Sequence, residues 1–222
     1  MRRGPRMPLE QLAPFLLVRP ETGRLDFPAM FGNDHPVELE IGCGKGGFLV
    51  EAAGARPEHN FVGIEIDRAL HFYIATRLAR RGLANARVMC CDARVLLRDA
   101  VADESLAALH VYFPDPWWKK RHHKRRLWTP EFAIECVRVL RPGGRLQIAT
   151  DVVEYYATMR ELLDSRAELE RVAADEQAGP ADAHDSLTNF ERKARSRGGS
   201  VWRAEYRRGG SPAGSVTEST SD

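Results

Sequence analysis

The 222-residue chain has few features of a membrane protein, a disulfide scaffold or a zinc protein. Its four cysteines show no Cys-x-x-Cys or paired Cys/His spacing, which disfavours structural zinc and disulfide pairing. No apolar run approaches the roughly 20 residues that span a bilayer, and the amino terminus lacks the apolar core of a secretory signal. We therefore expect reduced thiols, no metal, no membrane association and a cytoplasmic protein.

The chain also lacks a strong overall charge. Lys and Arg number 33 and Asp and Glu number 31, which leaves a net charge of +2, so any attraction for a polyanion must come from local clustering. The length suits one α/β domain. We place it at residues 34–208, after a partly disordered N-terminal extension at 1–33 and before a disordered C-terminal tail at 209–222.

Short apolar runs alternate with helical patterns along the domain, which is typical of a largely parallel sheet with helices on both faces. A hydroxyl cap and a proline at Thr129-Pro130 predict a helix that stops at Gly143-Gly144. Another helix is expected at Val152–Leu163. The expected strands are Val37–Ile41, Phe61–Ile66, Arg87–Cys91, Leu106–Phe113 and Arg145–Thr150, with weaker ones near Leu169–Val172 and Val201–Arg207.

A glycine-rich turn follows the first strand. Gly42, Gly44 and Gly47 satisfy the G-x-G-x-x-G pattern, which lets a ligand approach backbone amides at a helix N-terminus. Glu65, near the end of the next strand, stands where a carboxylate accepts the hydroxyls of an adenosine ribose. This spacing fits both NAD and S-adenosylmethionine.

Acidic residues recur at successive strand ends, where such sheets bind ligands. A cofactor with an ammonium and a sulfonium centre would be attracted by these carboxylates, whereas a pyrophosphate would be repelled, so the pattern favours S-adenosylmethionine over NAD. Glu40 taken alone is equally well explained as a partly buried carboxylate with its hydrogen bonds satisfied. The five acids are Glu40, Glu65, Asp92, Asp115 and Asp151.

A proline-bracketed aspartate is joined directly to a run of positive charge. The two prolines stiffen the turn that carries Asp115. The run at 119–126 offers six Lys or Arg side chains and two histidines, and Trp117, Trp118 and Trp128 flank it. Cations beside aromatic rings suit phosphates and nucleic-acid bases, and the histidines fit phosphate contacts better than metal ligands. The alternatives are a solvated loop for the run and core packing for Trp117.

These motifs resemble those of the bacterial tRNA (guanine-N7-)-methyltransferases over residues 37–206. The resemblance implies a Rossmann-like class I methyltransferase with a mostly parallel seven-stranded sheet. It also implies methyl transfer from S-adenosyl-L-methionine to N7 of guanosine 46 in the tRNA variable loop. The motifs are Glu40-Ile41-Gly42-Cys43-Gly44, Gly63-Ile64-Glu65, Phe113-Pro114-Asp115-Pro116-Trp117-Trp118-Lys119, Arg121-His122-His123-Lys124-Arg125-Arg126 and Thr188-Asn189-Phe190-Glu191.

The resemblance also implies roles for single residues, and Asp115 is placed at the reaction centre. Methyl-donor contacts fall on Glu40, Gly42, Gly44, Glu65, Asp92 and Asp115. Substrate contacts fall on Lys119, Asp151, Thr188, Asn189, Phe190 and Glu191, and RNA contacts on Arg121, His122, His123, Lys124, Arg125 and Arg126. The chain departs from the family pattern at Lys193, Ala194, Gly199 and Arg203, which puts the tRNA contacts of the C-terminal segment in question.

Three other functions compete with this interpretation. A non-catalytic RNA-binding protein on the same fold leaves the strand-end acids without a use. A dehydrogenase leaves the basic run unexplained, and a methyltransferase for proteins or small molecules is disfavoured by the same run. The sequence does not distinguish a monomer from a homodimer.

Overall fold

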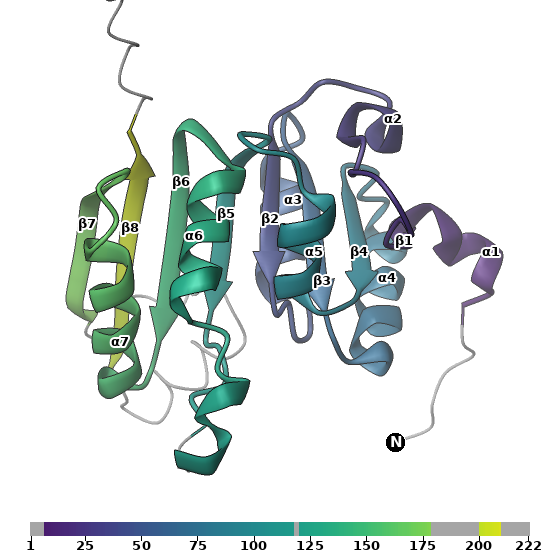
Figure 1. Cartoon of the computed structure of the whole chain (residues 1–222). Coiled ribbons are helices and arrows are strands. Elements are labelled where there is room, and N and C mark those ends of the chain that lie inside the picture. Colours follow the sequence, from purple (N-terminus) through teal and green to yellow (C-terminus); the bar gives the residue numbers. More distant parts are fainter. Residues whose placement is uncertain (1–6, 118–119, 179–199, 210–222) are drawn as a thin grey trace, which may run out of the picture.

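A computed structural model of the chain describes residues 7–117, 120–178 and 200–209. Within these ranges eight strands form one sheet in the order β1-β4-β3-β2-β5-β6-β8-β7 (Figure 1). Only β8 runs against its neighbours, because it pairs antiparallel with both β6 and β7. The strands are β1 (Leu16–Leu17), β2 (Val37–Ile41), β3 (Asn60–Glu65), β4 (Ala86–Cys90), β5 (Leu106–Tyr112), β6 (Leu140–Thr150), β7 (Leu169–Ala178) and β8 (Val201–Arg208).

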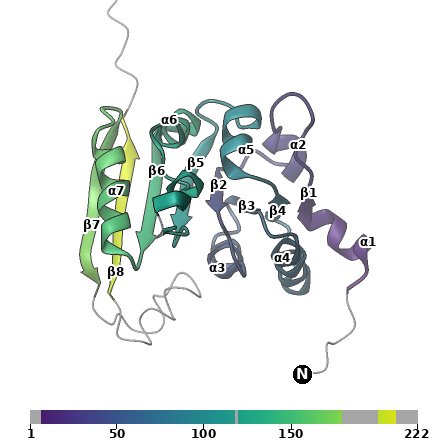
Figure 2. The ribbon, with the colours of Figure 1, turned by 60° about the horizontal axis from the view of Figure 1, so that its bottom comes forward.

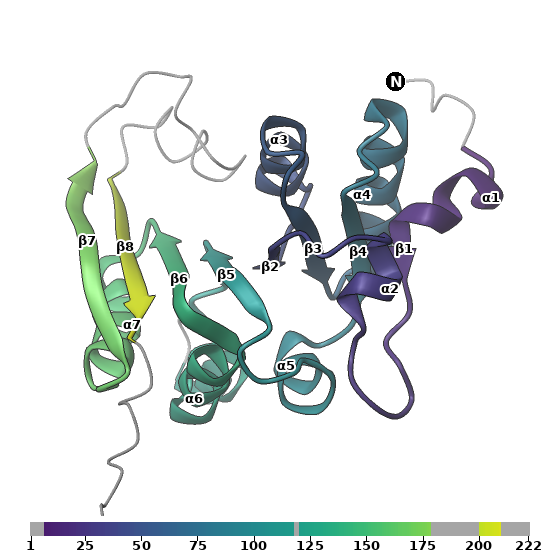
Figure 3. The same cartoon turned by 90° about the horizontal axis from the view of Figure 1, so that it is seen from above.

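Helices cover both faces of the sheet. Helices α3 and α4 lie on one face, and α5, α6 and α7 lie on the other, as the view from above shows (Figure 3). The α-helices are α1 (Leu9–Leu12), α2 (Phe27–Phe31), α3 (Gly47–Ala55), α4 (Arg68–Arg81), α5 (Ala93–Ala100), α6 (Pro130–Val139) and α7 (Val153–Asp164). Two short 3-10 helices are η1 (Ala13–Phe15) and η2 (Lys120–Arg125).

This architecture confirms the predicted fold class. The seven longer strands form the expected mostly parallel sheet, and β1 adds two residues to its edge by pairing with β4. The chain builds outward from β2 through β3 to β4, then returns to the other side of β2 with β5 and β6. The strand order therefore reverses between β2 and β5, which is where open α/β sheets form a crevice at the carboxyl ends of their strands.

The central strands are buried on both faces, which explains their near-continuous apolar sequences. Leu39, Val62 and Leu109 are fully buried on β2, β3 and β5. Burying a side chain of this size contributes about 1.5–3 kcal/mol relative to leaving it exposed. The rigid centre of the sheet therefore fixes the positions at which its strands end.

Two glutamates interrupt the apolar sequence of β2, and both are buried. Glu38 is 1% exposed; its carboxylate oxygens lie 2.5 Å from the Arg56 guanidinium and 2.8 Å from Nε2 of His110. Burial disfavours the charged form of Glu38, but His110 and Arg56 outweigh that effect and lower its pKa to about 2. Glu40 lies on the same face, two residues nearer the glycine-rich turn.

Helix α6 starts where the sequence predicts but ends earlier. The Thr129 hydroxyl accepts a hydrogen bond from the Phe132 amide (3.2 Å), which confirms the predicted cap. The predicted stop at Gly143-Gly144 is wrong, because the helix ends at Val139 and β6 begins at the next residue rather than at Arg145. Pro142 accounts for the difference, since a proline disfavours helical backbone in the residue before it and lacks the amide that would continue the helix.

No helix in the described ranges is long and apolar enough to cross a membrane.

Candidate functional site

A pocket of about 380 Å³ lies at the carboxyl ends of the central strands, near the reversal between β2 and β5. It brings together residues that are far apart in sequence: Gly42, Gly44, Glu65, Asp92 and Asp115 all line it. These are five of the six residues expected to contact the methyl donor.

The glycine-rich turn forms one wall of this pocket. Gly42 has a φ of 75°, and no atom would lie within 4 Å of a Cβ at that position. The neighbouring Gly63 of β3 has no room for a side chain, because a Cβ there would lie 2.6 Å from Sγ of Cys43. A side chain at Gly63 would therefore displace the turn, whereas the backbone at Gly42 is open to a ligand.

Glu65 and Asp92 already accept hydrogen bonds from the protein. Glu65 accepts from the Gly44 amide (2.7 Å) and, through its other oxygen, from the Asp67 amide (2.9 Å). Asp92 caps α5 and receives two bonds from the Arg94 guanidinium, of 3.1 and 2.7 Å. The hydrogen bonds from Arg94 lower the pKa of Asp92. Both carboxylates are fixed in place, with lone pairs left for further donors.

Glu40 does not line the pocket but lies beneath it, two residues before Gly42. It is 3% exposed, and its Oε2 atom has no hydrogen-bond partner among the described residues. Burial raises the pKa of Glu40 to about 8. An unsatisfied buried oxygen next to the pocket is the kind of atom that a cationic ligand group would pair with.

Asp115 stands on a turn with unusual backbone angles at both ends. Phe113 and Trp117 have φ values of 50° and 45°, in a region that L-residues with large side chains rarely adopt. The Phe113 amide donates to the Ala149 carbonyl (2.7 Å), which ties the turn to β6. Such strain persists only where the surroundings hold it, and it is frequent at functional sites. Asp115 is exposed in the pocket wall.

Asp151 is also exposed and directly follows β6, the strand next to β5. It is not one of the residues that line the pocket. The two carboxylates therefore end neighbouring strands, but only Asp115 belongs to the pocket wall.

The basic run begins directly after this turn. The helix η2, teal at the bottom of Figure 1, projects beyond the carboxyl edge of the sheet, and Figure 2 brings it forward. Arg121 and Lys124 are exposed. The Arg125 guanidinium lies 5.1 Å from the centre of the Trp117 ring, and that ring meets His122 edge-on at 5.8 Å. Trp117 and Arg125 both line the pocket, so the run is continuous with its wall.

Arg203, one of the four departures from the family pattern, lies in β8, and its carbonyl accepts a hydrogen bond from the Tyr156 hydroxyl (2.7 Å).

Several other predicted residues fall outside the described ranges. The residues outside are Trp118, Lys119, Thr188, Asn189, Phe190, Glu191, Lys193, Ala194 and Gly199; for His123 the backbone alone is described.

Sequence reasoning missed several residues of the pocket, among them Ile66, Arg94 and Tyr112. Ile66 is 72% exposed, and it follows Glu65 directly. An exposed apolar side chain at this place offers an apolar surface for a ring such as adenine, and the sequence does show an isoleucine directly after a strand-end acid. Arg94 and Tyr112 carry no comparable signal, because their placement depends on the folded sheet.

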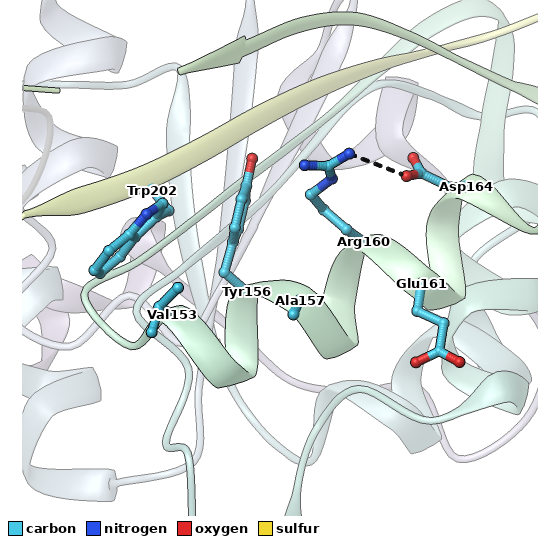
Figure 4. Close-up of a pocket in the computed structure, with 7 residues that line it drawn as sticks. All are labelled: Val153, Tyr156, Ala157, Arg160, Glu161, Asp164 and Trp202. Atoms are coloured by element: carbon cyan, nitrogen blue, oxygen red, sulfur yellow. Dashed lines mark ion pairs between the residues drawn. The ribbon is translucent and has the colours of Figure 1, made fainter. Parts of the chain in front are cut away.

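A larger hollow of about 670 Å³ lies against α7 (Figure 4). It is lined by Val153, Tyr156, Ala157, Arg160, Glu161, Asp164 and Trp202. Arg160 and Asp164 form an ion pair of 3.5 Å across one turn of the helix. None of the predicted site residues that the structure describes lines this hollow, so the smaller pocket is the candidate site.

The described ranges contain no group of three or more His, Cys, Asp or Glu side chains placed to hold a metal ion.

Comparison with known proteins identifies the family. The family model described as "Putative methyltransferase" matches residues 34–204. A tRNA (guanine-N(7)-)-methyltransferase of Rhodopirellula baltica is 44% identical over 187 residues, which cover 81% of this chain and 68% of that protein. The chain belongs to this family. A relative of the same name from Alcanivorax borkumensis is 38% identical, over 90% of this chain and 83% of its own.

Solved structures agree with this methyltransferase at the level of fold. The 16S rRNA methyltransferase KamB superposes with a TM-score of 0.63 at 16% identity, over 82% of this chain and 92% of its own. A geranyl diphosphate methyltransferase in complex with SAM superposes with a TM-score of 0.53, also at 16% identity, over 79% of each chain.

The methyl donor of this methyltransferase is S-adenosyl-L-methionine, and the pocket suits it. The volume lies in the range of small-molecule sites. The turn at Gly42 leaves backbone open, Ile66 offers an apolar surface, and the fixed carboxylates of Glu65 and Asp92 can accept hydroxyl and amino protons. The buried oxygen of Glu40 fits a cationic group.

Proposed function

We propose that this methyltransferase transfers the methyl group of S-adenosyl-L-methionine to N7 of guanosine 46 in the variable loop of tRNA. The observation that carries the proposal is the continuity of two surfaces: Asp115 stands in the donor-pocket wall, and the basic helix η2 begins five residues later. If η2 holds the RNA backbone of a nucleotide, the base of that nucleotide would enter the pocket beside Asp115. The names of the relatives support tRNA as the substrate.

In this proposal the donor is held by the strand-end residues. Gly42 presents open backbone beside Gly44 in the pocket wall, Glu65 accepts the ribose hydroxyls, and Asp92 accepts from the adenine amino group. Glu40 and Asp115 complete the set near the cationic part of the donor, where carboxylates are favourable.

The chemistry requires alignment more than proton transfer. Guanine N7 has an available lone pair and no proton at neutral pH, so its attack on the methyl carbon breaks the carbon–sulfur bond and returns that electron pair to sulfur. Positioning the two reactants supplies much of the rate. Positive charge develops on the imidazole part of the base, and the Asp115 carboxylate beside it stabilises that charge.

Recognition of guanine and of RNA falls to other residues. Asp151 can accept from the N1 and N2 protons of guanine, and Lys119 can donate to O6, which together would reject adenine. Thr188, Asn189, Phe190 and Glu191 are proposed as further substrate contacts. The run Arg121, His122, His123, Lys124 and Arg125 is proposed to hold the RNA backbone.

The proposed substrate also places the protein among tRNA molecules in the cytoplasm. We propose that the methyltransferase domain spans residues 34–208, between an N-terminal extension and a C-terminal tail.

Incubation with labelled S-adenosylmethionine and unmodified tRNA tests the proposal. After digestion of the tRNA to nucleosides, label is expected in 7-methylguanosine. A tRNA with adenosine at position 46 is expected to remain unlabelled. Label in another nucleoside would reject the proposed target. If tRNA is bound without any labelling, while the donor gives neither binding heat nor protection against unfolding, the non-catalytic RNA-binding alternative holds instead.

A further inference from the structure

The last arginine of the basic run does not behave like its exposed members. Nε of Arg126 donates a hydrogen bond to the Pro116 carbonyl (2.8 Å), ten residues back along the chain. Its guanidinium lies 5.1 Å from the centre of the Tyr155 ring. The side chain is partly buried, whereas Arg121 and Lys124 are exposed. Arg126 is therefore engaged within the protein.

The hydrogen bond acts on the strained end of the Asp115 turn. The Pro116 carbonyl belongs to the peptide group that includes the Trp117 nitrogen, and Trp117 has a φ of 45°. Fixing that carbonyl fixes the orientation of the peptide plane, and with it the unusual angle at Trp117. The neighbouring Arg125 lies over the Trp117 ring, so consecutive arginines hold the same end of the turn.

The second contact of Arg126 reaches the element that follows Asp151. Tyr155 is 1% exposed and lies in the first turn of α7, four residues after Asp151. Its hydroxyl accepts a 3.4 Å hydrogen bond from the Trp128 amide, which fixes the ring near the end of the basic run. A single guanidinium thus joins the turn that carries Asp115 to the helix that follows Asp151.

The geometry suits arginine and not lysine. A guanidinium is planar, so it can donate from Nε at its edge while its face lies against an aromatic ring. A lysine ammonium would keep the positive charge, but it lacks both the flat face and the Nε donor in this orientation.

We propose that Arg126 is a positioning residue of the reaction site rather than a phosphate ligand, holding the Asp115 turn in register with the start of α7. The inference rests on the proposed function, because it assigns Asp115 a role in the methyl transfer. Disturbing Arg126 changes where Asp115 stands, not how strongly RNA is attracted.

The test compares Arg126→Lys with Lys124→Ala in steady-state methylation of unmodified tRNA and in tRNA binding at several salt concentrations. Arg126→Lys is expected to lower kcat at saturating tRNA about tenfold or more and to keep the slope of log affinity against log salt. Lys124→Ala is expected to raise KM for tRNA and to reduce that slope by about 1. A phosphate ligand would instead tolerate lysine, so wild-type kcat in Arg126→Lys would overturn the inference.

Variants of Tyr155 give a second measurement that does not depend on replacing Arg126. Tyr155→Leu removes the ring and is expected to lower kcat more than Tyr155→Phe, which keeps it. The double variant with Tyr155→Leu and Arg126→Lys should lose less in log kcat than the two single variants lose together, because both substitutions remove the same contact. Additive losses would overturn the inference. If the wild-type protein fails to label tRNA, the proposed function is rejected. If the wild type labels tRNA and Arg126→Lys has the same kcat, only the inference about Arg126 is rejected.

Discussion

Asp115 combines exposure in the donor pocket with a backbone held at both ends of its turn. We expect Asp115→Asn to lower kcat by about 100-fold or more, which is the scale of losing one preorganised electrostatic contact to a transition state. The amide keeps the shape of the side chain and removes the charge, so tRNA affinity should change little. Single-turnover methylation with saturating tRNA measures the effect.

A matched control is Glu51→Gln, which removes the charge of an exposed acid in α3 that is paired with Arg81. Its single-turnover rate should remain near that of the wild type. Equal turnover of Asp115→Asn and Glu51→Gln would show that the Asp115 carboxylate has no part in the reaction.

Among the elements, η2 carries the exposed charge at the carboxyl edge. Arg121→Ala combined with Lys124→Ala is expected to weaken tRNA binding and to reduce the salt slope by about 1.4–1.8, since roughly 0.7–0.9 counterion is released per phosphate contact. Donor affinity should change little, because neither residue lines the pocket. Fluorescence titration of tRNA across a salt series, with calorimetry of the donor, measures both.

The control removes the same charge from another element. Arg80 and Arg81 lie in the last turn of α4, which runs away from the carboxyl edge. Arg80→Ala combined with Arg81→Ala should leave the salt slope near the wild-type value. An identical slope change in both double variants would mean that η2 attracts RNA only through the overall charge of the protein.

The elements also show which parts of the fold are predictable from sequence. The central strands were predictable because burial on both faces leaves continuous apolar runs. The end of α6 was not, because Pro142 rather than the glycine pair decides it, and neither was the two-residue β1, whose pairing with β4 carries no local signal.

In the site, the pocket acids were predictable because they follow the ends of strands. The contacts of Arg126 were not, since they join residues 10 and 29 positions apart.

On the scale of the whole molecule, the two buried glutamates of β2 should make stability depend on pH in opposite directions. Glu38 has a pKa lowered from 4.5 to about 2, so its contribution is present above pH 4.5 and is lost as the pH falls towards 2. Glu40 has a pKa raised from 4.5 to about 8, so its contribution is present below pH 4.5 and is lost as the pH rises towards 8.

Chemical denaturation of Glu38→Gln and Glu40→Gln between pH 3 and 8, without the donor, tests this pair. Glu38→Gln should be less stable than the wild type at neutral pH by on the order of 3 kcal/mol, with the deficit shrinking below pH 4.5. Glu40→Gln should gain stability relative to the wild type as the pH rises above 4.5, because the amide avoids the cost of ionising a buried carboxyl. Parallel pH profiles would contradict both assignments. Opposite slopes would show that β2 carries one carboxylate held charged by His110 and Arg56 and another whose ionisation burial opposes.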